Sequence, residues 1–143
     1  MKTTLVQADK VARSWHLMDA AGKPAGRLAV EITKILRGKN KVTYSPAIDG
    51  GDFVIVINAD KVALSGNKES LKVYQTFSGY LRGRKTMVAS EVRVKNPTRI
   101  VEQAVKGMMP RNHLSRTQLK RLKVYAGSEH PHEAQMPQPI ESK

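Results

Sequence analysis

Residues 15–37 read WHLMDAAGKPAGRLAVEITKILR and give the first strong signal for the fold. Its first five residues are short and largely apolar, a pattern compatible with a β-strand. Gly22 and Gly26 then bracket a turn. A helix is predicted from about Gly26 to Arg37, and Gly38 is placed to end it. Its apolar stripe consists of Leu28, Ile32, Ile35 and Leu36. A strand, a turn and a helix in this order predict the first half of a βαβ unit.

The next strong signal is the run FVIVI at residues 53–57, which follows a loop predicted over residues 39–52. A strand that is apolar on both faces is typical of the middle of a sheet covered on both sides. The two signals together predict a layered α/β domain.

Shorter patterns predict the remaining elements. Asn96 and Pro97 fit the N-cap and the first position of a helix, which Gly107 would end. Residues 62–65 and 71–77 are two strand candidates that form either a hairpin or two separate pieces, and the sequence leaves this open. The other predicted elements are a short helix at residues 87–94 and a short strand at 124–126.

Length and charge limit the classes of protein. The chain has 143 residues, which favours one domain, and its 25 Lys and Arg against 12 Asp and Glu give a formal charge of +13. Such an excess repels itself unless a polyanion compensates it, so nucleic acid is the first candidate partner and an anionic membrane the second. With no cysteine in the chain, disulfide scaffolds and thiolate metal sites are excluded. We expect no signal peptide and no membrane span, because no apolar run has the required length.

The most basic stretch of the chain is residues 105–132, and no acidic residue occurs between Glu102 and Glu129. Ser115 followed by Gln118 fits a capping box, with Leu114 and Leu119 as a hydrophobic staple. On the helix this predicts, Arg116, Lys120 and Lys123 would share one face, which suits a row of phosphates. The alternative is a basic helix that is only solvated. A membrane-binding helix would need a strong apolar face, and this one offers only Leu119 and Leu122.

Residues 78–85 (SGYLRGRK) form a second basic segment, beside Phe77. Cations mixed with aromatic side chains can pair with phosphates and stack on unpaired bases, although a flexible surface loop is the alternative. From Pro131 on, three prolines and few apolar residues predict an extended tail that orders only against a partner.

Signals for catalysis are weak. The glycine turn at residues 22–26 lacks the spacing of a nucleotide-binding loop. His130 and His132 are a poor ligand pair for a metal, and we expect them to contact RNA instead. Asp49, Asp52 and Asp60 lie near turns where capping explains them. We therefore expect no enzyme, cofactor, metal or small-molecule substrate. Trp15 is interpreted as an anchor of the core or of a strand edge.

Several short motifs occur together in one order. They begin with Trp15-x-x-x-Asp19-Ala20-x-Gly22-x-x-x-Gly26-Arg27-Leu28-Ala29, continue with Arg37-Gly38-Lys39, Gly51-Asp52 and Asn58-Ala59-Asp60-Lys61, and end with Val105-Lys106-Gly107-Met108-Met109-Pro110, Leu122-Lys123-Val124-Tyr125-Ala126-Gly127 and His130-x-His132. Over about residues 15–137 the chain resembles the family of the universal large-subunit ribosomal protein thirteen, in its bacterial or organellar form. It departs from that pattern at Ser115, where the family usually has glycine, and at Arg82-Gly83, where it usually has two glycines.

The resemblance implies a three-layer α/β/α domain with a small, mostly parallel four-stranded sheet, basic loops and an extended C-terminal tail. We expect an arm at residues 1–14, one RNA-binding domain at 15–130 and the tail at 131–143. The implied role is non-enzymatic: a cytoplasmic or organellar ribosomal protein that binds large-subunit ribosomal RNA beside neighbouring ribosomal proteins and supports early assembly. Translational repression through messenger RNA is a second implied role. The side chains expected to contact RNA are Arg27, Arg37, Lys39, Lys41, Arg82, Arg84, Lys85, Lys106, Arg111, His113, Arg116, Lys120, Arg121, Lys123, His130 and His132.

Overall fold

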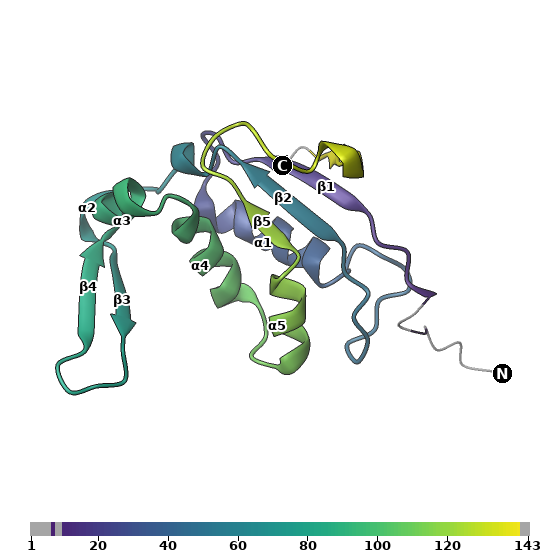
Figure 1. Cartoon of the computed structure of the whole chain (residues 1–143), viewed down its shortest axis with the longest axis horizontal. Coiled ribbons are helices and arrows are strands. Elements are labelled where there is room, and N and C mark those ends of the chain that lie inside the picture. The colour runs from purple at the N-terminus through teal and green to yellow at the C-terminus, as the bar shows by residue number, and fades with distance from the viewer. Residues whose placement is uncertain (1–6, 8–9, 141–143) are drawn as a thin grey trace.

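The predicted βαβ unit is confirmed by the computed structural model, which describes residue 7 and residues 10–140. Strand β1 (Trp15–Asp19) leads through helix α1 (Ala25–Leu36) to strand β2 (Phe53–Ile57), and β1 and β2 pair in parallel from Trp15↔Phe53 to Asp19↔Ile57. Strands β5 (Leu122–Val124) and β6 (Gln138–Pro139) complete a parallel sheet in the order β5-β2-β1-β6 (Figure 1). The continuous apolar run of β2 is thereby explained, because the strand lies inside the sheet.

Helix α1 ends where the sequence predicts, at Gly38. This residue has φ +71°, a conformation that side-chain-bearing residues rarely adopt. Its N–H donates to the carbonyl of Ile35 at 2.9 Å, and the N–H of Lys39 donates to the carbonyl of Lys34 at 2.9 Å. These two bonds form a Schellman motif, which turns the chain sharply into the loop of residues 39–52.

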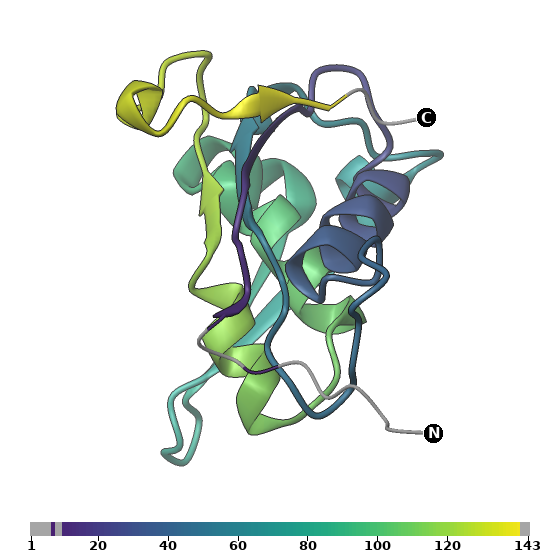
Figure 2. The same ribbon diagram turned by 90° about the vertical axis from the view of Figure 1, so that its right-hand side faces the viewer.

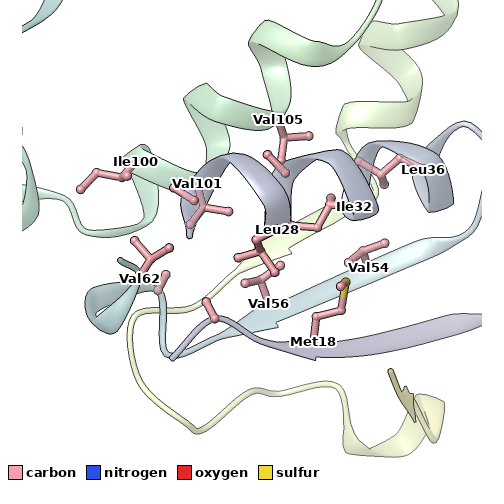
Figure 3. Packing of buried hydrophobic residues seen from close by; sticks show 14 of the residues in the cluster. Met18, Leu28, Ile32, Leu36, Val54, Val56, Val62, Ile100, Val101 and Val105 are labelled. Atoms are coloured by element: carbon pink, nitrogen blue, oxygen red, sulfur yellow. The ribbon is translucent and has the colours of Figure 1, made fainter. Parts of the chain in front are cut away.

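The hydrophobic core lies between the sheet and the two helices α1 and α4 (Thr98–Met108). Every second residue of the two central strands faces these helices, so Met18, Val54 and Val56 are fully buried. Figure 3 shows Leu28 and Ile32 of α1 and Val101 and Val105 of α4 packed above them. Burial of each such side chain contributes about 1.5–3 kcal/mol, so this layer dominates the stability of the fold.

The opposite face of the sheet carries the aromatic residues. Trp15 and Phe53 are register partners whose rings stack at a centroid distance of 4.2 Å and an interplanar angle of 7°. His132 lies against Trp15 at 5.2 Å, in the C-terminal segment that also holds the 3-10 helix η3 (Glu133–Gln135). Figure 2 shows this segment on the side of the sheet away from α1. The arrangement confirms the α/β class and is consistent with three layers, and Trp15 is the sheet anchor that the sequence predicts.

A two-stranded antiparallel hairpin, β3 (Val73–Phe77) with β4 (Arg84–Val88), projects away from the main sheet (Figure 1). It is preceded by the 3-10 helix η2 (Ala59–Lys61) and helix α2 (Lys68–Leu71), and followed by helix α3 (Ala89–Lys95). The sequence offered a loop at residues 78–85 and a helix from 87, and both boundaries are wrong. Met87 and Val88 lie opposite Tyr74 and Val73, so cross-strand packing of apolar side chains extends the strand and delays the helix.

The start of helix α5 (His113–Leu119) also differs from the prediction. Asn112 is the N-cap, and its side-chain oxygen accepts a hydrogen bond from the N–H of Ser115 at 2.9 Å. Ser115 is therefore inside the first turn, where it is buried, and the capping box with its staple is not formed as predicted. The helix begins three residues earlier than predicted, and the Asn112 side chain satisfies the free N–H of Ser115 in its first turn. Helix α4 likewise starts after Pro97 and runs through Gly107 to Met108.

The C-terminal segment is tied to the sheet over its described part. Gln138 and Pro139 of β6 pair with His16 and Leu17 of β1, and the N–H of Ile140 donates to the carbonyl of Leu17 at 2.8 Å. An extended tail is present, but it supplies the edge strand rather than lying outside the domain, because β1 offers a free edge for backbone pairing. Most of the predicted N-terminal arm, and residues 141–143, lie outside the described residues.

Candidate nucleic-acid interface

A groove runs between α4 and α5, and we call it the α4–α5 groove. It encloses about 420 Å³. Lys106 enters it from α4, Arg111 from the connecting loop and Arg116 from α5, and all three are exposed. Within residues 10–140 none of these three cations forms an ion pair with a carboxylate. The fold therefore brings three predicted RNA contacts together into one cationic groove.

The row of cations predicted to follow Arg116 is interrupted. Lys120 continues the helical path as the C-cap of α5 and is exposed, but Lys123 lies in β5 opposite Ile55. The helix stops because Leu122 and Val124 pair with the apolar strand β2. Lys123 is therefore turned toward the aromatic face of the sheet, where it is half-buried, and leaves the row.

Arg121 faces inward. Its guanidinium donates to the carboxylate of Asp49 and to the carbonyl of Gly51 at 2.9 Å, and it lies over the ring of Phe53. The side chain is only 8% exposed. These contacts fix the loop before β2 to the start of β5, so Arg121 is not carried into the proposed interface. Asp49, for which the sequence suggested only a turn, is its partner.

The loop after α1 holds three predicted contacts in different surroundings. Lys39 is exposed, and Arg37 donates to the hydroxyl of Tyr44 at 3.1 Å. The ammonium of Lys41 donates to Asp52 at 2.5 Å and to the carbonyl of Ala12 at 2.9 Å. Lys41 therefore holds the N-terminal segment against the loop, and Lys39 is the member best placed to meet a partner.

Asp52 is the centre of a buried polar network that the sequence reasoning missed. Its carboxylate accepts from the N–H of Ser14 at 2.9 Å and lies 3.3 Å from the Nε2 of His16, in addition to Lys41. Burial would raise the pKa of this carboxyl, but the hydrogen bonds from His16, Lys41 and Ser14 outweigh it and lower the pKa below its usual value. The only signal in the sequence was an acidic residue directly before an apolar strand.

Arg82, Arg84 and Lys85 lie on the hairpin, exposed, and far along the chain from the α4–α5 groove. Arg82 adopts φ +61°, a left-handed conformation that glycine takes at less cost. A glycine at this position, as in the family pattern from which Arg82 departs, would adopt this conformation more easily. The three cations form a second basic surface on an element of its own.

Arg27 lies near the N-terminus of α1 and lines a shallow groove together with Lys68 and Lys72. Neither lysine is among the predicted RNA contacts, and Glu69 lies between them in the sequence. Glu69 forms an ion pair with Arg93, and the hydrogen bond from Arg93 lowers the pKa of the Glu69 carboxyl. Arg93 therefore compensates the negative charge between the two lysines. Lys68 and Lys72 thus join Arg27 as candidate contacts.

The predicted histidine contacts are divided between two regions. His113 is exposed at the start of α5, near the α4–α5 groove. His132 is half-buried, and its Nε2 is hydrogen-bonded to the hydroxyl of Tyr125 at 2.8 Å, while the Nδ1 of His130 accepts from the N–H of His132 at 3.2 Å. These contacts give His130 and His132 a role in packing the C-terminal segment on the sheet, which does not require RNA. No group of three potential metal ligands occurs among the described residues.

The described part of the chain contains no helix that is long and apolar enough to cross a membrane.

Comparison with known proteins finds relatives of this chain over nearly its whole length. The family model described as ribosomal protein L13 matches residues 13–131. The chain is 54% identical to the large ribosomal subunit protein uL13 of Coprothermobacter proteolyticus over 99% of both chains. It is 51% identical to the protein of the same name from Akkermansia muciniphila, over 98% of this chain and 99% of that one. The match to the Thermotoga maritima protein is 53% over 98% of this chain and 94% of that one. The chain therefore belongs to the ribosomal protein L13 family.

Proposed function

We propose that the chain is a structural, non-catalytic component of the large ribosomal subunit, where it binds ribosomal RNA and supports early assembly. The observation that carries this proposal is the α4–α5 groove, in which Lys106, Arg111 and Arg116 converge from three segments. Cations fixed by a folded scaffold bind a phosphate backbone without first having to be ordered. The membership of the ribosomal protein L13 family supports the choice of ribosomal RNA as the polyanion.

Charge distribution supports the same function. The formal charge of +13 already counts every carboxylate of the chain, so the protein cannot neutralise it by itself. The carboxylates of Asp49, Asp52 and Glu69 are in addition paired with Arg121, Lys41 and Arg93. The exposed cations are left for a partner. A large-subunit RNA offers many phosphates close together and would relieve this repulsion. A role in repressing translation through messenger RNA would use the same surface, since phosphates carry no sequence information.

Co-sedimentation tests the proposal. The full-length chain and the variant Lys106→Ala/Arg111→Ala/Arg116→Ala are each mixed with large ribosomal subunits that lack the protein and run through gradients of rising salt. We expect the unaltered chain to remain with the particle at a salt concentration that removes the variant, because salt weakens phosphate contacts and the variant has fewer of them. The matched control is the variant Lys34→Ala/Lys61→Ala, which removes two exposed cations outside the proposed surfaces. Failure of the unaltered chain to sediment with the particle even at low salt would refute the proposal.

A further inference from the structure

The hairpin tip, residues 77–85, is the exposed end of the β3–β4 hairpin. At the base of the hairpin Tyr74 is buried and Met87 is partly buried against the core. Beyond that pair, the residues from Gln75 to Thr86 are all exposed except Gly83, which is half-buried. An isolated two-stranded sheet is marginal in water, so the base holds the hairpin in place and the tip gains nothing from burial.

The tip nevertheless carries the largest exposed apolar side chains in this part of the chain. Phe77 is 70% exposed, Tyr80 78% and Leu81 97%. Single exposed apolar residues are ordinary, but two aromatic rings and a leucine within five positions form a local concentration that solvent disfavours. Such a concentration indicates a surface that is covered by a partner.

The loop that presents these side chains has a defined conformation. The N–H of Gly83 donates to the carbonyl of Tyr80 at 2.9 Å, and the N–H of Ser78 donates to the carbonyl of Gly83 at 3.1 Å. A Cβ on Gly83 would lie 2.0 Å from the hydroxyl oxygen of Ser78 and 2.9 Å from the carbonyl oxygen of Tyr80. The turn is therefore packed against itself, and the aromatic side chains project from a preformed loop.

The charge around these rings selects the partner. Arg84 lies directly opposite Phe77 in the hairpin, Lys85 lies opposite Thr76, and Arg82 is in the turn. No acidic residue occurs between Glu69 and Glu91. Aromatic rings bordered only by cations fit a partner that offers flat apolar faces and negative charge together, which is the chemistry of unpaired nucleotides.

We propose that the hairpin tip is a stacking platform for unpaired bases of RNA, with Phe77 and Tyr80 as the stacking side chains and Arg82, Arg84 and Lys85 as their phosphate contacts. This rests on the proposed function and deepens it. The α4–α5 groove meets phosphates of any RNA, whereas the hairpin tip requires a loop, bulge or end whose bases are unstacked. Paired bases in an A-form helix do not offer their faces to a side chain.

Two RNA probes test the inference with the full-length chain: a fluorescein-labelled single-stranded RNA, and the same strand annealed to its complement. For Phe77→Ala/Tyr80→Ala we expect the affinity for the single strand to fall about ten-fold or more, since stacking on each base contributes on that order. The affinity for the duplex should change less than about two-fold, because phosphate contacts dominate there. Phe77→Tyr/Tyr80→Phe, which retains both rings, should bind both probes like the unaltered chain.

Controls separate this inference from the proposed function. Leu71→Ala/Val94→Ala removes two exposed apolar side chains off the hairpin and should leave both affinities unchanged. Lys106→Ala/Arg111→Ala/Arg116→Ala should weaken binding of both probes, which tests the groove alone. An unchanged single-strand affinity in Phe77→Ala/Tyr80→Ala, or an equal loss on both probes, would overturn the stacking platform while leaving the groove intact. Binding of the unaltered chain to neither probe would overturn both proposals. Binding of an acidic protein at Phe77 and Tyr80, in place of RNA, would also overturn the stacking platform.

Discussion

Arg121 and Asp49, which are 72 positions apart in the chain, form a buried ion pair that joins the start of β5 to the loop before β2. The Nη1 of Arg121 donates to Oδ1 of Asp49 at 2.9 Å, and Nη2 donates to the second carboxylate oxygen. One arginine of the basic stretch therefore serves the fold, while the adjacent Lys120 remains exposed.

Replacement of Arg121 by alanine should lower the free energy of unfolding by about 3 kcal/mol or more, because it leaves the Asp49 carboxylate and the Gly51 carbonyl without their partner. Lys120→Ala is the matched control: this cation is adjacent but exposed, so its loss should cost no more than about 0.5 kcal/mol. Urea unfolding at neutral pH measures both. Equal, small effects of the two substitutions would show that the buried pair is not important for stability.

The hydrogen-bond network around Asp52 should make the free energy of unfolding decrease at low pH. The pKa of Asp52 is lowered in the folded protein, so the stabilisation is fully present above the unfolded-state value of about 4 and is lost as the pH falls through and below it. Asp52→Asn should be less stable at neutral pH, because it loses the ion pair with Lys41, and its acid unfolding should be less steep.

Thermal midpoints between pH 7 and pH 2 would check this, with Glu102→Gln as the control for an exposed carboxylate. An acid limb in Asp52→Asn that matches the unaltered chain would assign the acid sensitivity to other groups.

Gly51 is required by a close approach of two backbone segments. A Cβ at this position would lie 1.8 Å from the carbonyl oxygen of Leu36, at the end of α1. Because backbone atoms cannot move aside, Gly51→Ala should cost about 3 kcal/mol or more. A Cβ on the adjacent Gly50 meets nothing within 4 Å, so Gly50→Ala should change stability by less than about 1 kcal/mol in either direction. Denaturant midpoints of the two variants decide whether this contact sets the path of the loop.

The α4–α5 groove should contribute to RNA affinity without contributing to folding. Lys106→Ala/Arg111→Ala/Arg116→Ala should keep its thermal midpoint within a few degrees, since all three side chains are exposed. With on the order of six phosphates neutralised, the unaltered chain should show a slope of log affinity against log salt near −5. Each lost contact should reduce the slope by about 0.9. RNA titrations at a series of salt concentrations measure the slope, and a slope unaffected by the triple substitution would place the phosphate contacts elsewhere.

The C-terminal segment should be protected in the free protein. The N–H of Ile140 is hydrogen-bonded to Leu17 in the central sheet, and His132 packs between Trp15 and Tyr125. Amide exchange followed by NMR should show slow exchange at Ile140 before RNA is added, with little change on binding. The sequence alone favours the opposite result, a tail that becomes protected only on RNA, so the experiment distinguishes the two expectations directly.

The sequence alone is sufficient to predict the helices and strands whose signals are local. The apolar stripe of α1, the glycine at its end and the continuous apolar run of β2 predict a βαβ unit, because helix periodicity, left-handed φ and burial on both faces each have a direct residue signature. The net charge likewise predicts a polyanionic partner. The family follows from motifs spread over most of the chain.

Two features depend on the tertiary structure alone: which cations face outward, and where residues 138–139 pair. Arg116 and Arg121 lie on the same short stretch, yet one lines a groove and the other is buried, because pairing of β5 with β2 ends the helix between them. The residues 138–139 have no strand signature and become one because β1 offers an edge at that place. Contacts of this kind join residues far apart in sequence, so their energies depend on the assembled fold and leave no pattern in the local order of residues.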